Sequence, residues 1–106
     1  MVPLEMLFLA RFESDILAGN KTITIRDEAD SHYEIGRTIA AVIYEDGRVF
    51  GQLQVLGVEP VLLSELNANH AFEENMTMEQ LQDVLEEIYP GIEQLYVVSF
   101  KLIKNN

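Results

Sequence analysis

The sequence has no cysteine, few basic residues and no long hydrophobic run. Without cysteine, the 106-residue chain forms no disulfide bond and offers no thiolate ligand to a metal ion. No apolar stretch reaches the roughly 20 residues that a transmembrane helix needs. The first residues also lack the basic region and the small-residue cleavage site of a signal peptide. We therefore expect a cytoplasmic protein with no membrane partner, folded as a single domain over residues 1–106.

Basic residues are especially scarce in the second half of the chain. The formal net charge is -11, and the segment between Arg48 and Lys101 holds nine acidic residues and no basic one. Proteins that bind long nucleic acids gain most of their affinity from lysine and arginine side chains that neutralise phosphates. The charge therefore disfavours a long RNA or DNA partner, whereas it does not disfavour a small neutral ligand.

Signatures of cofactor and metal sites are also missing. The glycines form neither the G-x-G-x-x-G pattern nor a phosphate-binding loop. The two histidines, His32 and His70, stand 38 positions apart and lack the spacing of metal ligands. We expect both histidines to have structural roles or to be exposed, and we expect no cofactor and no metal ion.

The most informative stretch that is present is residues 19–26, where isoleucines alternate with polar residues. Ile23 and Ile25 have the period of two that is typical of a strand with one apolar face. The polar residues expected to project together from the opposite face are Thr22, Thr24 and Arg26. Lys21 has the wrong parity for this face. It joins the group only if the chain bends at Gly19-Asn20, where we expect the preceding helix to end.

A solvated strand face is the simplest interpretation of these polar residues. In the chemical interpretation, Thr24 is a nucleophile and Lys21 is its base, because a threonine hydroxyl attacks an amide only when a base takes its proton. Burial and the nearby charge of Arg26 would lower the pKa of Lys21 and keep part of it neutral. The leaving amine also needs a proton donor, and Glu73 and Glu74 are both candidates.

Hydrophobic periodicity predicts an α+β protein. Strands are expected at residues 4–9, 22–26, 35–44, 48–58 and 94–103. Helices are expected at residues 11–18, 65–74 and 78–89, the last two as an insertion before the final strand. Glu45-Asp46-Gly47 predicts a hairpin turn, and Pro60 should end the strand ladder.

The two inserted helices carry their own sequence signals. Ser64 is a candidate N-cap for the first, and the residues expected to point inward there are Leu66, His70 and Phe72. Thr77 and Gln80 form a capping box for the second. Its predicted apolar stripe contains Met78, Leu81, Val84, Leu85 and Ile88.

Motifs along the chain resemble one known family. The run Gly19-x-Lys21-x-x-Thr24-x-Arg26, which follows a short R-F-x-x-D-I-L-x-G helix, resembles the signature of the ASCH domain. The match is closest to the small bacterial branch called the YqfB family. Further matching stretches are 22–28 with His32 after it, His70-Ala71 followed by 73–77, 88–91 and 96–98. Together these stretches extend over nearly the whole chain, so the combination is specific.

The resemblance implies a fold and an activity. The fold would be the ASCH fold, a small mixed β-barrel related to the PUA domains of RNA-binding proteins. The activity would be hydrolysis of the acetyl amide of N(4)-acetylcytidine to cytidine and acetate, without a cofactor. In that family a lysine is the proton acceptor, a threonine the nucleophile and a glutamate the proton donor. Matched motif by motif, these roles fall on Lys21, Thr24 and Glu74.

Further possibilities stay open from the sequence. Arg26 is a candidate for substrate binding, or for lowering the pKa of Lys21. The substrate could be the acetylated nucleoside, the free base or acetylated RNA. The alternative to an enzyme is a non-enzymatic PUA-like RNA-binding module, and a third possibility is a protein-interaction domain that uses the acidic helix at 77–89.

Overall fold

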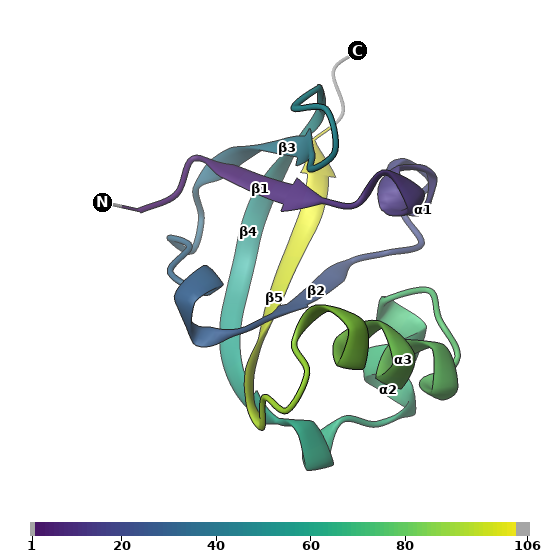
Figure 1. Cartoon of the computed structure of the whole chain (residues 1–106). Coiled ribbons are helices and arrows are strands. Elements are labelled where there is room, and N and C mark those ends of the chain that lie inside the picture. Colours follow the sequence, from purple (N-terminus) through teal and green to yellow (C-terminus); the bar gives the residue numbers. More distant parts are fainter. Residues whose placement is uncertain (1, 104–106) are drawn as a thin grey trace.

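The computed structural model describes residues 2–103, which form five strands, three α-helices and three short 3-10 helices (Figure 1). The strands are β1 (Glu5–Phe8), β2 (Ile23–Arg26), β3 (Thr38–Ile43), β4 (Val49–Leu62) and β5 (Gln94–Ile103). The helices are η1 (Ala10–Phe12), α1 (Glu13–Leu17), η2 (Glu28–Asp30), η3 (Leu63–Glu65), α2 (Ala68–Glu73) and α3 (Met78–Ile88). The predicted order of strands and helices is confirmed, including the two inserted helices before the last strand.

The strands form one mixed sheet in the order β1-β3-β4-β5-β2. β1 runs parallel to β3, and the other neighbouring strands are antiparallel. Figure 1 shows β4 and β5 as the long curved strands at the back, with β1 and β2 crossing in front of them. The predicted α+β class is confirmed, but the word barrel applies only loosely. β1 and β2 are the two edges of the sheet and do not pair with each other, so the sheet is not closed.

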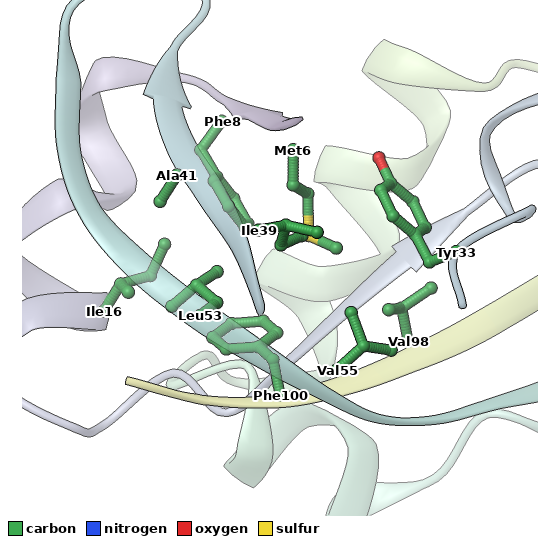
Figure 2. Packing of buried hydrophobic residues seen from close by; sticks show 10 residues of the cluster. All are labelled: Met6, Phe8, Ile16, Tyr33, Ile39, Ala41, Leu53, Val55, Val98 and Phe100. Carbon is green, nitrogen blue, oxygen red and sulfur yellow. The ribbon is translucent and has the colours of Figure 1, made fainter. Parts of the chain in front are cut away.

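Two clusters of buried side chains hold the curled sheet together. The first, shown in Figure 2, contains Met6, Phe8, Ile16, Tyr33, Ile39, Ala41, Leu53, Val55, Val98 and Phe100. The second packs α2 and α3 against β2, β4 and β5 and contains Ile23, Ile25, Val61, Leu66, Ala71, Leu81, Leu85 and Leu95. Alternating residues of β2 therefore contribute to the second cluster, as the period of two predicted.

The prediction that Pro60 ends the ladder is wrong. β4 continues to Leu62, and Pro60 is paired with Tyr96 of β5. β3 pairs with β4 as far as Gln54, and Gly36 and Arg37 extend the hydrogen bonding to Val55, so Pro60 lies beyond the part of β4 that has a neighbour on this side among residues 2–103. Proline is tolerated on such an edge because its missing N–H removes no bond to a second neighbour.

The predicted helix at 65–74 is also partly wrong. Ser64 lies inside η3, and α2 is instead capped by Asn67, whose side chain accepts a hydrogen bond from the Asn69 N–H at 2.9 Å. Asparagine competes well for this position because its carbonyl oxygen reaches the free N–H groups of the first turn. Phe72, expected to point inward, is 80% exposed.

The helix α3 follows its prediction closely. Thr77 and Gln80 form the predicted capping box, with Thr77 Oγ1 accepting from the Gln80 N–H at 3.1 Å and Gln80 Oε1 accepting from the Thr77 N–H at 2.9 Å. Leu81 and Leu85 of the predicted stripe are buried, whereas Ile88 at the end of the helix is exposed. Within residues 2–103 no helix is long and apolar enough to cross a membrane.

Candidate active site

The strand β2 is buried on both faces. Ile23 and Ile25 point into the second hydrophobic cluster, and Thr24 and Arg26 on the opposite face are buried as well. Thr22, expected to share their face, is exposed because it lies just before the strand. The simplest interpretation, a solvated polar face, is therefore wrong, since this face lies against a covered space rather than open solvent.

The bend predicted before Lys21 is present. Gly19 has a φ of +80°, a conformation that glycine adopts without strain. The N–H groups of Asn20 and Lys21 then both donate to the Asp15 carbonyl, at 3.0 and 3.1 Å. These two hydrogen bonds to one carbonyl turn the chain back against α1, and as a result Lys21 is only 3% exposed.

Glu74 is brought to the same place from the other end of the chain. It follows α2 as the C-cap residue, and the next residue, Asn75, has a φ of +59°, which ends the helix. The Glu73 carbonyl accepts a hydrogen bond from the Thr22 N–H at 2.8 Å, which joins the end of α2 to the start of β2. Glu74 points inward and is buried, whereas Glu73 is exposed.

Lys21 and Glu74 form a buried ion pair in which Lys21 Nζ contacts Glu74 Oε1. Lys21 Nζ also lies 5.0 Å from the centre of the Phe12 ring. Burial and, to a smaller extent, the positive charge of Arg26 lower the pKa of Lys21 to about 7, against the opposing effect of Asp15. An amine with this pKa is neutral in a large fraction of molecules near neutral pH, which is what a general base requires.

Arg26 distributes its hydrogen bonds over three parts of the chain. Its Nε donates to Thr24 Oγ1 at 2.9 Å, its Nη1 to Asp30 Oδ2 at 2.5 Å and its Nη2 to the Leu7 carbonyl of β1 at 2.6 Å. The guanidinium also lies 5.1 Å from the centre of the Phe8 ring. Arg26 therefore bridges the two unpaired edges of the sheet and fixes the Thr24 side chain.

A pocket of about 420 Å³ lies over these residues and is mainly apolar. Its polar residues include Lys21, Thr24, Arg26 and Glu74. Its apolar wall is built by Leu7, Phe8, Leu9, Phe12, Ile25, Tyr44, Val84, Leu85, Ile88 and Tyr89. The volume suits a small organic molecule, and a few convergent polar groups in an apolar cleft are typical of ligand sites.

The two histidines lie away from this pocket and have the structural or exposed roles expected of them. His70 Nδ1 accepts a hydrogen bond from the Asn67 N–H at 3.1 Å and helps to cap α2. His32 is exposed and pairs with Glu28 at 3.2 Å. Among residues 2–103, no group of histidine and acidic side chains is arranged to hold a metal ion.

All four predicted site residues thus line one pocket. Sequence reasoning missed Asp30 and Tyr33, because neither lies in the polar strand or in the motifs from which the site was predicted. Arg26 ends β2 and Asp30 lies in η2, so their ion pair joins a strand to the loop after it and has no helical spacing that would reveal it in the sequence. No sequence signal linked Tyr33 to Asp30 either. In the structure, Asp30 Oδ1 accepts a hydrogen bond from the Tyr33 hydroxyl at 2.9 Å.

Solved structures resemble this fold. The ASCH domain from Lactobacillus crispatus superposes with a TM-score of 0.77 at 16% identity, covering 92% of this chain and 77% of that one. The ASCH protein from Zymomonas mobilis gives a TM-score of 0.73 at 16% identity, covering 94% of this chain and 69% of that one. At such low identity, these similarities establish the fold and do not extend to the chemistry.

Curated relatives are much closer in sequence. A protein from Vibrio vulnificus named N(4)-acetylcytidine amidohydrolase is 55% identical over 101 residues, which cover 95% of this chain and 97% of the relative. A protein of the same name from Edwardsiella ictaluri is 53% identical over 100 residues, covering 94% of each chain. No protein-family model matches the chain. The resemblance found in the sequence is confirmed, and the chain belongs to the family of the N(4)-acetylcytidine amidohydrolases, with the fold of an ASCH domain.

Proposed function

We propose that this protein hydrolyses the acetyl amide of N(4)-acetylcytidine, releasing cytidine and acetate. The observation that carries the proposal is the buried pair of Lys21 and Glu74, which lines the same mainly apolar pocket as Thr24. The family to which the chain belongs supports the same reaction, because the curated relatives bear the name of that activity.

The pair can supply both a base and an acid if its one shared proton lies on the carboxyl group. Lys21 is then a neutral amine and Glu74 a neutral acid, and this form has the same number of protons as the charged pair. An apolar environment disfavours charge separation and so favours the neutral form. The lowered pKa of Lys21 supports this assignment of the proton.

In the proposed first step, Lys21 Nζ takes the proton of the Thr24 hydroxyl, and Thr24 Oγ1 bonds to the acetyl carbon. The bond from that carbon to N4 then breaks, and Glu74 gives its proton to the departing amine of cytidine. The products of this step are cytidine and acetylated Thr24. Lys21 is then protonated and Glu74 ionised, so the proton count balances.

In the second step, water attacks the acetyl ester and gives a proton to Glu74. The ester bond to Thr24 breaks, and Lys21 returns its proton to the threonine oxygen. Acetic acid leaves and ionises in solution, and the three side chains regain their starting states. Arg26 fits this scheme because its charge stabilises the Thr24 oxygen that it contacts. Its remaining N–H groups can also bind the substrate.

A rival mechanism uses the same residues without an acetylated enzyme. Glu74 would activate water directly, and Lys21 with Thr24 would bind the developing oxyanion. Mass spectrometry of a rapidly quenched reaction separates the two mechanisms, because only the first forms acetylated Thr24.

The decisive experiment measures acetate release from N(4)-acetylcytidine by purified protein. Lys21→Ala, Thr24→Ala and Glu74→Gln should each lower kcat/KM by about 10²–10⁴-fold, since each removes a participant in proton transfer or nucleophilic attack. Glu73→Gln is the matched control, because Glu73 is adjacent but exposed, and it should retain activity within about twofold.

Other outcomes would overturn parts of the proposal. Near-normal turnover by Thr24→Ala would contradict both mechanisms. No acetate release by the wild-type protein, together with RNA binding that weakens steeply with salt, would favour the RNA-binding alternative.

A further inference from the structure

The guanidinium of Arg26 is fixed on the side opposite Thr24 by Asp30. Arg26 is buried, and its Nη1 donates to one carboxylate oxygen of Asp30 while its Nε donates to Thr24. A guanidinium is planar and rigid, so a contact at one nitrogen sets the direction in which the others point. The position of the Asp30 carboxylate therefore determines where the Nε–H meets the Thr24 oxygen.

Asp30 is itself held from two directions. Its second oxygen, Oδ1, accepts from the Tyr33 hydroxyl at 2.9 Å, and its backbone N–H donates to Asp27 Oδ1 at 3.1 Å. Tyr33 is buried in the first hydrophobic cluster, and Figure 2 shows its hydroxyl pointing away from Val55 and Val98. A core aromatic ring thus anchors an otherwise partly exposed carboxylate.

This chain of contacts has a consequence for the Thr24 hydroxyl. A hydroxyl oxygen has two acceptor lone pairs and one hydrogen, and the Arg26 Nε–H occupies one of the lone pairs. The hydroxyl hydrogen must therefore point away from Arg26. Lys21 lines the same pocket as Thr24, and its neutral amine is an acceptor for that hydrogen.

We propose that Asp30, braced by Tyr33, is a positioning residue that locks the Arg26 guanidinium and so directs the Thr24 hydroxyl proton toward Lys21. This inference rests on the proposed function, in which Thr24 is the nucleophile and Lys21 is the base. Asp30 acts through Arg26 and contacts neither Thr24 nor Lys21. Asp30 also pairs with the guanidinium whose positive charge lowers the pKa of Lys21, so removal of the Asp30 charge should strengthen that effect of Arg26.

Two substitutions of Asp30 separate its position from its charge. Asp30→Asn keeps an oxygen acceptor for Arg26 and offers an NH2 group that can donate to the Tyr33 hydroxyl oxygen, so the negative charge is lost, the contact with Arg26 is kept and the bond with Tyr33 is reversed. Asp30→Ala removes the contact itself. The matched control is Glu28→Gln, which removes one negative charge from the same short helix at an exposed side chain whose ion pair within residues 2–103 is with exposed His32.

The first measurement is the pH profile of acetate release. Asp30→Ala should lower kcat by about 10–100-fold with KM within about threefold, because misplaced reacting groups lower the rate more than the binding. Tyr33→Phe, which frees the Asp30 carboxylate but keeps it, should lower kcat by about 3–10-fold. Asp30→Asn should keep kcat within about threefold, and Glu28→Gln should match the wild type.

Asp30→Asn should also shift the acid limb of that profile to lower pH by about half a unit. Loss of the negative charge leaves the Arg26 cation unopposed, which destabilises protonated Lys21 and lowers its pKa. The charged and titratable groups around Lys21 and this network are Asp15, Arg26, Asp27, Asp30, Tyr33, Glu74 and Tyr89, and the substitution changes only one of them. A merely structural role for Asp30 would not move the limb.

The second measurement needs no substrate and so separates this inference from the proposed function. The chain has three lysines, Lys21, Lys101 and Lys104, so the side-chain NMR signal of Lys21 can be assigned and titrated. The pH midpoint of the Lys21 titration should fall in Asp30→Asn and stay unchanged in Glu28→Gln. If the wild type releases no acetate but the midpoint still falls, the proposed function is wrong and the coupling of Asp30 to Lys21 stands.

The inference is overturned if folded Asp30→Ala keeps kcat within about twofold and the Lys21 midpoint is the same in Asp30→Asn and wild type. If Asp30→Ala does not fold, the test relies on the variants Tyr33→Phe and Asp30→Asn. A wild-type rate in Tyr33→Phe together with an unshifted midpoint in Asp30→Asn then overturns it.

Discussion

Two ion pairs of this protein join the same kinds of groups in opposite environments. Arg48 contacts Glu13 on the surface through both terminal nitrogens, and Lys21 contacts Glu74 inside the pocket. On the surface, the hydrogen bond from Arg48 lowers the pKa of Glu13 and so stabilises its charged form. In the pocket, burial dominates and lowers the pKa of Lys21 to about 7. Removal from water thus turns a fixed charge into a group that can exchange a proton.

The largest contrast should appear in folding stability. Lys21→Met leaves Glu74 buried without its partner and should lower the free energy of unfolding by about 3 kcal/mol. The double substitution Lys21→Met with Glu74→Leu should recover most of this loss, because an apolar pair of similar volume leaves no polar group buried without a partner. Chemical denaturation of both variants measures the difference.

Neither variant should release acetate, so recovery of stability without activity would show that the pair is kept for chemistry. A double variant no more stable than Lys21→Met would contradict the view that the unpaired Glu74 causes the loss.

A second contrast concerns pH. The proposed base is neutral Lys21, so kcat/KM should rise with pH around a midpoint of about 7. The surface pair of Arg48 and Glu13 should not influence this midpoint. The profile of acetate release between pH 5 and 9 measures this midpoint. A profile that is flat across neutrality would argue against Lys21 as the base.

The same pKa shift makes folding stability depend on pH, in a direction set by linkage. The pKa of Lys21 is about 7 when folded, against an ordinary value of 10.5, so the unfolded chain binds more protons between these values. The contribution of Lys21 to stability should therefore increase as pH rises through this window. Lys21→Met should lack this part of the pH dependence.

The smallest effect is expected from the surface pair. Arg48→Ala should leave the activity, its pH midpoint and the denaturation midpoint within experimental error of the wild type, because exposed ion pairs contribute little and are screened by salt. A clear loss of activity in Arg48→Ala would mean that the hairpin between β3 and β4 influences the pocket more than its surface position indicates.

The sequence predicted much of this arrangement, since its signals are local. The period of two in β2 correctly placed Ile23 and Ile25 in the core, and the capping box at Thr77 correctly placed the start of α3. Gly19 also revealed the bend that brings Lys21 inward. Each of these features depends on residues within a few positions of one another.

Features that depend on distant segments were harder to predict. Arg26 is buried through its contacts with the Leu7 carbonyl and the Phe8 ring of β1, which lies far away in the sequence, and periodicity does not report such contacts. The choice between Glu73 and Glu74 needed the family resemblance, because both lie at the same helix end. The continuation of β4 past Pro60 depends on which neighbour that strand lacks.

The contact from Arg26 to the Leu7 carbonyl also bears on aggregation. The carbonyls of Leu4 and Phe8 accept hydrogen bonds from Ala40 of β3 and from Tyr44 just after it, whereas the Leu7 carbonyl accepts from Arg26 of β2. Unpaired strand edges invite pairing with other chains, and this contact covers part of one edge. A wider pocket would separate β1 from β2 and expose both edges. The contact between Arg26 and Leu7 in the wall of the pocket therefore also shields part of the edge of β1.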